Sequence, residues 1–500
     1  MSAAARTDVS QRAGETLDPP DWDEVRAQGH RMLDDMIDYI AGIRDRPVWQ
    51  PMSPETRQRF RSTLPHAPTD LAEVYRDFSS LVVPHATGNV HPAFMGWVHG
   101  GGTAVGMLAE MLAAGLNANL GGRDHAPIEI ERQVADWTRQ LFGFPQGASG
   151  IFVTGTSMAN LMAVVVARRA ALGASVRREG LGESGDRLRA YTSKAAHGCI
   201  AKAMDICGLG SDALACIAVD AAHRMNVAEL RGAIARDRDA GLQPFLVVAS
   251  AGTVDIGAID DLEAVAALCR AEGLWFHVDG AFGALAMLSP ELAPKLAGID
   301  QADSLALDFH KWGQVPYDAG FLLVRDGVRH REAFASPAAY LRRETRGLAA
   351  GPEWPCDLGP DLSRGFRALK TWFTLRTFGT DRLGVVIAHS CELARHLRSR
   401  VLDEPELELM APVNLNIVCF RYRADDAING EIVADVQESG IAAPSTTMLD
   451  GRLAIRAAIV NHRTQACDID RLIAAVLMFG RLRIAGLTPL IEIQSPPLAP

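Results

Sequence analysis

Hydrophobic and polar residues follow two different periods along the middle of the chain. Continuous apolar runs are typical of strands that are buried on both faces, and they occur at 245–250 (FLVVAS), 274–278 (LWFHV) and 320–324 (GFLLV). Apolar residues at helical spacing predict helices at 107–118, 129–142, 157–171 and 262–271. Shorter runs predict strands at 151–153, 190–192, 216–219 and 304–307. Strands that alternate with helices predict an α/β fold with a mainly parallel sheet and helices on both faces.

The two ends of the chain have a different character. A helix is predicted at 23–44, and the prolines that follow it break the chain into short pieces. Residues 335–365 are rich in Gly, Pro and charge, which predicts a long loop. Beyond this loop we expect helices at 367–378, 383–402, 430–439 and 469–479, and strands at 415–421 and 452–460. The predicted domains are an N-terminal helical arm (1–90), a large α/β domain (91–378) and a small α+β domain (379–500).

Composition narrows the function classes. The 500 residues are 48% hydrophobic and 22% charged, which is typical of a soluble globular chain of two to four domains. The net charge of −10 argues against broad nucleic-acid binding, which requires a basic face. The first twenty residues lack the apolar core of a signal peptide, and the longest apolar run, 161–167, is too short for a membrane helix. The eight cysteines form no CxxC pair, so we predict no metal site and a cytoplasmic location.

Three polar features follow predicted strands, where ligands bind in α/β sheets. The first is the segment 154–157 (TGTS), which separates a strand from a helix. Small residues and hydroxyls at the start of a helix favour binding of a phosphate, although a simple helix cap explains the same residues. The second is Asp279, at the end of an apolar strand. A carboxylate there requires a cationic partner, which a protonated pyridine or a structural salt bridge could supply.

The third feature is Lys311, within DFHKW at 308–312. Only five of the fifty basic residues are lysines, so a lysine between aromatic residues needs a reason. A partly desolvated lysine is the usual partner of a carbonyl cofactor, while a surface lysine whose charged end reaches solvent is the alternative. A phosphate cradle, a carboxylate for a pyridine nitrogen and a reactive lysine are together what pyridoxal 5'-phosphate (PLP) requires.

With these three features the chain resembles the PLP-dependent group II decarboxylases, of the aromatic-amino-acid and glutamate decarboxylase type. The resemblance covers about residues 25–480. It rests on HPAFMGW (91–97), IEIERQVADW (128–137), TGTSMANLMAVVVAR (154–168), HGCIAKA (197–203), AGTVDIGAIDDL (251–262), WFHVDGAFG (275–283), DFHKW (308–312), FRALKTWF (366–373) and LAIRAAIVNHRT (453–464). It implies a fold-type-I PLP-dependent transferase-like architecture, with a seven-stranded sheet and a smaller C-terminal domain, in a homodimer.

The resemblance also implies a role for individual residues. Lys311 matches the lysine that holds PLP as an internal aldimine, and Asp279 matches the carboxylate on the pyridine nitrogen. The residues that match the other cofactor contacts are Thr156 and Ser157 at the phosphate, His197 and Ala281 against the ring, Thr253 near the cofactor and His310 beside the lysine. The implied catalytic residues are Lys311, His197 and Asp279. The implied reaction is decarboxylation of an L-amino acid through a quinonoid intermediate.

The chain departs from the family pattern in two places. Typical members carry a loop tyrosine, whereas 351–357 (GPEWPCD) has none and the nearest is Tyr340. Loss of that hydroxyl accompanies a switch to oxidative decarboxylation–deamination to an aldehyde, so this product is an alternative. We also expect 345–362 to act as a lid. On the substrate side, Asn119, Gly121 and Arg123 stand near apolar family positions, which predicts a more polar pocket. Arg123 is a candidate to pair with an acidic group of the substrate, and a salt bridge at the surface or between subunits is the alternative.

Three rival interpretations remain at the level of sequence. An α/β-hydrolase would use Ser157 as nucleophile, His99–Gly102 as oxyanion loop, and Asp279 and His310 as partners, but it leaves Lys311 unexplained. Another fold-type-I reaction, such as aminotransfer, would share the cofactor constellation. A non-catalytic binding protein would not need the complete set of cofactor-binding residues.

Overall fold

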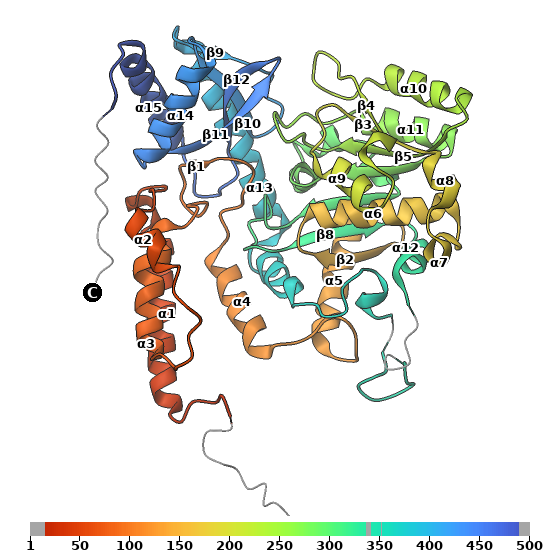
Figure 1. The fold of residues 1–500 in the computed structure, drawn as a ribbon, viewed down its shortest axis with the longest axis horizontal. Helices are drawn as coiled ribbons and strands as arrows, with labels where there is room; N and C mark the ends of the chain where they lie inside the picture. The colour runs from red at the N-terminus through yellow and green to blue at the C-terminus, as the bar shows by residue number, and fades with distance from the viewer. Residues whose placement is uncertain (1–15, 337–341, 352, 490–500) are drawn as a thin grey trace, which may run out of the picture. The chain divides into compact units, whose positions relative to one another are not determined.

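The computed structural model describes residues 16–336, 342–351 and 353–489 (Figure 1). Its described residues form two compact units. The first comprises 16–45 and 51–86, and the second comprises 46–50 and 87–489. Tyr340 and Pro352 lie outside the described residues. Among the described helices, none is both long and apolar enough to cross a lipid bilayer.

The first unit is helical. Helix α1 (Trp22–Ala41) begins at Asp21, whose carboxylate accepts the backbone N–H groups of Asp23 and Glu24. Such an acidic N-cap satisfies helix donors that would otherwise have no partner. The predicted helix 23–44 is therefore confirmed apart from its last turn, which is a separate 3-10 segment at Ile43–Asp45. The proline-rich stretch contains two short helices, α2 (Pro54–Arg59) and α3 (Leu71–Asp77).

The second unit is built on a seven-stranded sheet with the order β2-β8-β7-β6-β5-β3-β4. Strand β8 is antiparallel to both neighbours, and the other pairs are parallel. The strands are β2 (Ser149–Val153), β3 (Leu188–Ser193), β4 (Leu214–Ile217), β5 (Gln243–Ser250), β6 (Trp275–Asp279), β7 (Ser304–Asp308) and β8 (Gly320–Val324). The predicted mainly parallel, seven-stranded sheet is confirmed.

Helices cover both faces of this sheet because its central strands are apolar on both sides. Alternate residues of β5 and β6, such as Val247 and Phe276, enter one core with α5, α10, α11 and α13. Their neighbours, such as Val248 and Trp275, enter a second core with α6 and α9. Figure 1 shows α6 (yellow) lying across this second face. The helices are α4 (Ala104–Leu116), α5 (Ala126–Leu141), α6 (Thr156–Leu172), α7 (Val176–Glu179), α8 (Gly182–Asp186), α9 (Cys199–Ile206), α10 (Val227–Asp239), α11 (Leu262–Glu272) and α12 (Gly327–Phe334).

The C-terminal part carries a second sheet, of order β1-β11-β12-β10-β9. Its edge strand β1 (Phe94–Met95) comes from the region predicted to begin the large domain, and it pairs in parallel with β11. The remaining elements are β9 (Leu407–Leu409), β10 (Ile417–Tyr422), β11 (Ala443–Leu449), β12 (Arg452–Ala458), α14 (Asp426–Glu438) and α15 (Ala466–Ile484). This confirms the smaller α+β C-terminal part.

Helix α13 (Arg367–Asp403) connects the two sheets and is interrupted at Gly379. The backbone there has φ 72° and ψ 158°, a conformation that glycine adopts readily and other residues rarely. The two helices predicted at 367–378 and 383–402 are therefore the two halves of α13.

Candidate active site

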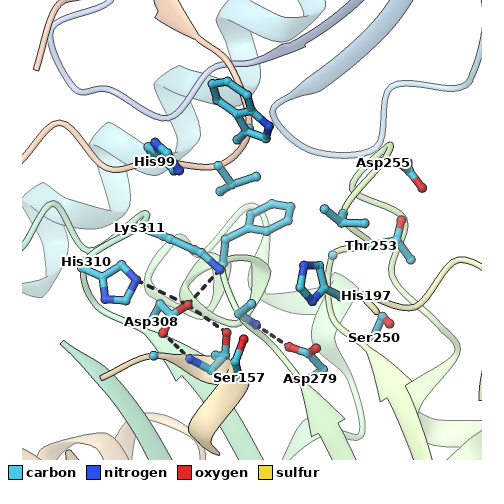
Figure 2. Close-up of a pocket in the computed structure, with 18 of the residues that line it drawn as sticks. His99, Ser157, His197, Ser250, Thr253, Asp255, Asp279, Asp308, His310 and Lys311 are labelled. Atoms are coloured by element: carbon cyan, nitrogen blue, oxygen red, sulfur yellow. Dashed lines mark hydrogen bonds and ion pairs between the residues drawn. The ribbon is translucent and has the colours of Figure 1, made fainter. Parts of the chain in front are cut away.

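The principal pocket opens at the carboxyl ends of β5, β6 and β7, beside the start of α6 (Figure 2). Its volume is about 500 Å³, within the range that small-molecule ligands occupy. The eight residues predicted from the sequence all line it: Thr156, Ser157, His197, Thr253, Asp279, Ala281, His310 and Lys311. Part of this convergence follows from the parallel sheet, in which the carboxyl ends of neighbouring strands lie at one edge. Ser250, Asp279 and Asp308 are the last residues of β5, β6 and β7.

Asp279 is a buried carboxylate with few donors. Its Oδ1 accepts the backbone N–H of Ala281 at 3.1 Å, and its Oδ2 accepts the side-chain amide of Asn160 at 3.0 Å. Burial raises the pKa of Asp279, while the charge of Lys311 and the two hydrogen bonds act in the opposite direction. A further cationic or strongly donating partner would stabilise the ionised form of this carboxylate, and a protonated pyridine nitrogen is such a partner.

Lys311 lies across the pocket from Asp279 and contacts a different carboxylate (Figure 2). Its Nζ lies 2.8 Å from Oδ2 of Asp308, and its side chain is 21% exposed. Asp308 also accepts two hydrogen bonds from Thr156, one from the backbone N–H at 2.8 Å and one from Oγ1 at 2.9 Å. Asp308 therefore ties the lysine to the first residue of α6.

The start of α6 approaches β8 very closely. A Cβ on Gly320 would lie 2.3 Å from the Cα of Gly155, so a side chain at Gly320 would push the first turn of α6 away from the sheet. Both donors of Thr156 are used by Asp308, whereas Ser157 is exposed to the pocket. Because the first N–H groups of a helix lack intrahelical partners and carry partial positive charge, this 17-residue helix presents an anion-binding end there.

The two pocket histidines differ in environment. His197 is exposed in the loop between β3 and α9, and its Nδ1 accepts the backbone N–H of Cys199 at 3.2 Å. His310 is buried, and its Nδ1 accepts the backbone N–H of Ala319 at 3.0 Å. Burial lowers the pKa of His310 to about 4, so it is neutral at pH 7 with its proton on Nε2. The Nε2 of His310 lies 3.6 Å from Asp308.

These residues fit PLP on three counts. The buried carboxylate of Asp279 lacks a full cationic partner, the amine of Lys311 reaches the same pocket, and the start of α6 offers donors for a phosphate. By contrast, the described residues contain no group of three or more His, Cys, Asp or Glu side chains arranged to hold a metal ion.

Comparison with known proteins agrees with this geometry. The sequence profile of the pyridoxal-dependent decarboxylase conserved domain matches residues 54–423. An aromatic-L-amino-acid decarboxylase of Bacillus atrophaeus is 32% identical, over 88% of this chain and 92% of its own length. A phenylacetaldehyde synthase of Arabidopsis thaliana is 29% identical, over 89% of this chain and 94% of its own. The crystal structure of Oryza sativa TDC with PLP and tryptamine superposes with a TM-score of 0.86 at 26% identity, covering 94% of this chain and all of that one.

The chain belongs to the pyridoxal-dependent decarboxylase family. The expected cofactor, PLP, the fold-type-I architecture and the classification as a PLP-dependent amino-acid decarboxylase, a carboxy-lyase, are thereby confirmed. The roles assigned to individual pocket residues stay predictions.

The α/β-hydrolase interpretation is wrong. Besides the family match, the described polar contacts of His310 are to the backbone of Ala319 and to Asp308, and none joins it to Ser157. A serine hydrolase requires its histidine to contact the nucleophile and an orienting acid.

The predicted substrate role of Arg123 is not supported within this chain of the decarboxylase. Its guanidinium lies over the ring of Trp354, 4.6 Å from the centroid. Asn119 accepts the backbone N–H groups of Gly121 and Arg364, and a Cβ on Gly121 would collide with the backbone of Leu362. These residues hold the loop after α12, and none of them lines the pocket of the same chain.

The described part of the predicted lid is anchored rather than placed over the pocket. Trp354 is buried, donates its indole N–H to the carbonyl of Ala350 at 3.1 Å and is contacted on its ring by Arg343 as well as Arg123. Arg343 also pairs with Asp357. No described residue of 342–362 lines the pocket of its own chain, so a lid over that pocket is not observed.

Four residues that shape the site were not predicted from the sequence. Asp308 and Arg456 lie within stretches that carried the resemblance, but neither received a role. Asn160 lies one helical turn after Thr156, a spacing that places both on one face of α6. Tyr317, whose ring centroid is 4.2 Å from that of His310, had no signal in the sequence.

Proposed function

We propose that this decarboxylase holds PLP through Lys311 and removes the α-carboxylate of an L-amino acid in the pocket described above. The observation that carries the proposal is the placement of Lys311 and Asp279 in one pocket, with the exposed Ser157 at the start of α6 between them in Figure 2. PLP, when bound, supplies a ring that accepts the electron pair left behind as carbon dioxide departs.

Each residue has a task in this proposal. Asp279 keeps a proton on the cofactor's ring nitrogen, because a carboxylate in a buried site favours a positive neighbour. Ser157, Thr156 and the first turn of α6 surround the phosphate, with Thr156 acting through Asp308. His197 and Ala281 lie against the ring, and His310 and Thr253 complete the wall. Asp308 holds or receives a proton at Nζ of Lys311, which lies 2.8 Å away.

Arg456 shapes the mouth of the pocket. Its buried guanidinium donates to the backbone carbonyls of Val254, Asp255 and Trp97, and to Oγ of Ser445 at 3.4 Å. These bonds join β12 to two pocket walls that are far apart in the sequence. Burial of this kind also excludes water, which favours loss of a charged carboxylate.

The rim of the pocket favours a substrate with a planar side chain. His99 stacks on Trp97 at 5.8 Å and contacts Tyr317 edge-on at 5.8 Å. Trp97 and Tyr317 are both exposed large aromatic residues that line the pocket. Aromatic side chains interact well with such an array, and the B. atrophaeus relative is an aromatic-L-amino-acid decarboxylase.

The proposed reaction is tested by supplying the purified enzyme and PLP with each proteinogenic L-amino acid. Carbon dioxide, amine, ammonia and hydrogen peroxide are measured together. We expect carbon dioxide from an aromatic amino acid, its loss in Lys311→Ala, and its retention in Lys202→Ala. Carbon dioxide release that survives Lys311→Ala, or no release from any amino acid, would contradict the proposal.

A second candidate is oxidative formation of an aldehyde. Residues 345–362 contain no tyrosine, and one relative is a phenylacetaldehyde synthase. The balanced reaction consumes one oxygen and one water, and yields aldehyde, carbon dioxide, ammonia and hydrogen peroxide. Stoichiometric peroxide in the same assay supports this product, and stoichiometric amine without oxygen uptake excludes it.

We propose further that the enzyme is a cytoplasmic homodimer. The eight cysteines are all free thiols, which suits a reducing compartment. Helix α4 exposes Met111, Leu112 and Leu116, and such an apolar group suits contact with a second copy. Light scattering at assay concentration tests the assembly, and a fully active monomer would contradict it. Cell fractionation tests the location.

A further inference from the structure

A chain of buried side chains leads away from the pocket behind Asp279. His277 lies two residues before Asp279 on β6, so both side chains leave the same face of the sheet, toward α6. Parallel pairing places His277 opposite Ser304 of β7. Asn160 of α6 lies between His277 and Asp279, and Asn160, His277 and Ser304 are all almost fully inaccessible to solvent.

The four groups form an unbroken series of hydrogen bonds. Ser304 Oγ lies 2.8 Å from Nδ1 of His277, and Nε2 of His277 lies 2.8 Å from Oδ1 of Asn160. The amide nitrogen of Asn160 lies 3.0 Å from Oδ2 of Asp279. At the far end, Trp275 donates its indole N–H to Ser304 Oγ at 2.9 Å.

An ionised Asp279 fixes the direction of every bond in the chain. A carboxylate only accepts, so the NH₂ group of Asn160 faces Asp279 and its oxygen faces His277. That oxygen also only accepts, so the proton of the neutral imidazole is on Nε2 and Nδ1 is bare. Bare Nδ1 accepts the hydroxyl proton of Ser304, whose oxygen is in turn held by Trp275.

The same groups can satisfy a protonated Asp279 if the bonds between Asp279, Asn160 and His277 reverse, while Trp275, which only donates, keeps its bond to Ser304. The acid would donate to the oxygen of Asn160, whose NH₂ would then donate to Nε2 of His277. The imidazole proton would move to Nδ1, which has the backbone carbonyl of Ser304 at 3.1 Å as an acceptor. Ser304 therefore offers Nδ1 a donor for one direction and an acceptor for the other.

We propose that Ser304, His277 and Asn160 form a reversible hydrogen-bond chain that stabilises the ionised form of Asp279, and that His277 and Asn160 are positioning residues for the protonated ring nitrogen of PLP. The inference rests on the proposed role of Asp279. Lys311 and His197 are the other groups whose charges act on Asp279, and the thiol of Cys199 lies 4.0 Å from its Oδ2; all three are unchanged in the variants below.

Ser304→Ala is the sharpest variant, because it removes the hydroxyl and keeps the backbone carbonyl. The backbone carbonyl of residue 304 is then the remaining partner of Nδ1 of His277, and because a carbonyl only accepts, it favours a proton on Nδ1. This proton position belongs to the reversed chain and to a protonated Asp279. His277→Phe breaks the chain altogether, whereas His277→Gln can keep an N–H donor toward Asn160. His330 provides a matched control: it is a second fully buried histidine, on α12, and it does not line the pocket.

The experiment loads the enzyme with PLP labelled with ¹⁵N at the ring nitrogen and follows its NMR shift from pH 6 to 9. We expect a protonated nitrogen in the wild type, His277→Gln and His330→Phe. In Ser304→Ala and His277→Phe we expect the proton affinity of this nitrogen to fall about tenfold or more. Residues that hydrogen-bond to a metal ligand change metal affinity by a similar factor. A wild-type shift in both Ser304→Ala and His277→Phe would overturn the inference.

Asp279→Asn separates this inference from the proposed role of Asp279. If Asp279→Asn changes the ¹⁵N shift but neither Ser304→Ala nor His277→Phe does, only the chain is refuted. If Asp279→Asn leaves the shift unchanged, the carboxylate does not contact the ring nitrogen and both fail. A direct check is the ¹⁵N signal of His277 in the loaded enzyme: a proton on Nε2 supports the chain and a proton on Nδ1 overturns it.

Discussion

Asp308 joins Lys311 to the first residue of α6: its carboxylate lies 2.8 Å from Nζ of Lys311 and accepts both donors of Thr156. Asp308 is the last residue of β7 and is almost fully buried. The contact couples the reactive lysine to the helix end that we assign to the phosphate. A change at one of these three residues therefore alters the surroundings of the other two.

The first prediction concerns this carboxylate. Asp308→Ala leaves the donors of Thr156 and the ammonium of Lys311 without their acceptor, and we expect it to reduce the free energy of unfolding by about 3 kcal/mol. Asp308→Asn keeps an acceptor for Thr156 and should cost about 1 kcal/mol. Urea unfolding of the cofactor-free enzyme measures both. Equal losses in the two variants would contradict a stabilising role for the hydrogen bonds from Thr156.

The second prediction concerns a buried ion pair below the site. Arg364 pairs with Glu131 and also donates to the carbonyls of Leu120 and Phe152, at 2.9 and 2.8 Å. Arg364→Met leaves the Glu131 carboxylate buried without its cation, so we expect a loss of about 3 to 5 kcal/mol of stability. Glu131→Gln added to Arg364→Met removes the orphaned charge and should recover part of this loss. Chemical denaturation of the single and double variants tests the coupling, and purely additive losses would argue against it.

The third prediction concerns acid stability. Burial lowers the pKa of His330 to about 4, while an unfolded histidine has a pKa of about 6.5. Between these values the unfolded chain binds a proton that the native protein does not, so this group makes stability rise with pH in that window. In His330→Phe the slope should fall by about 1.4 kcal/mol per pH unit. Denaturation between pH 4.5 and 6 measures it, and an unchanged slope would show that His330 protonates in the native state.

The fourth prediction concerns the mouth of the pocket. Arg456→Met removes the donors that bind the carbonyls of Trp97, Val254 and Asp255. The two walls then lose their common anchor, and we expect kcat/KM to fall by tenfold or more, because reacting groups tolerate little misplacement. PLP affinity, measured by absorbance titration, should change less because the described hydrogen bonds of Arg456 reach neither Lys311 nor Asp279. A variant with normal kcat/KM would contradict the anchoring role.

Much of the fold follows from local pattern. Strands β5, β6 and β8 are continuous apolar runs, and their burial on both faces makes such runs unambiguous. Helices α9, α10 and α12 were not predicted, and α10 contains six charged residues among thirteen. Strand β11 (APSTTML) carries little apolar signal, because Ser445, Thr446 and Thr447 occupy its centre. Its place is decided by pairing with β12 and β1, which depends on the whole domain.

The candidate site was predictable at positions where the type of residue itself indicates a chemical role. Lys311 and Asp279 stood out because an isolated lysine or aspartate at the end of an apolar strand needs a partner. Asn160 and Asp308 did not, because their contacts join β6 and β7 to α6 and arise only when the helix crosses the sheet. The position of Arg123 was not predictable, because nothing in the sequence indicated that it stacks on Trp354, 231 positions further along.

Chemical reduction shows whether Lys311 holds the cofactor. Borohydride treatment of the PLP-loaded enzyme fixes the cofactor on its lysine, and digestion with peptide mass analysis locates it. The chain has only five lysines, so the assignment is simple. We expect one pyridoxyl group per chain, on Lys311. A group on Lys194, Lys202, Lys295 or Lys370 instead, or on no lysine, would contradict it.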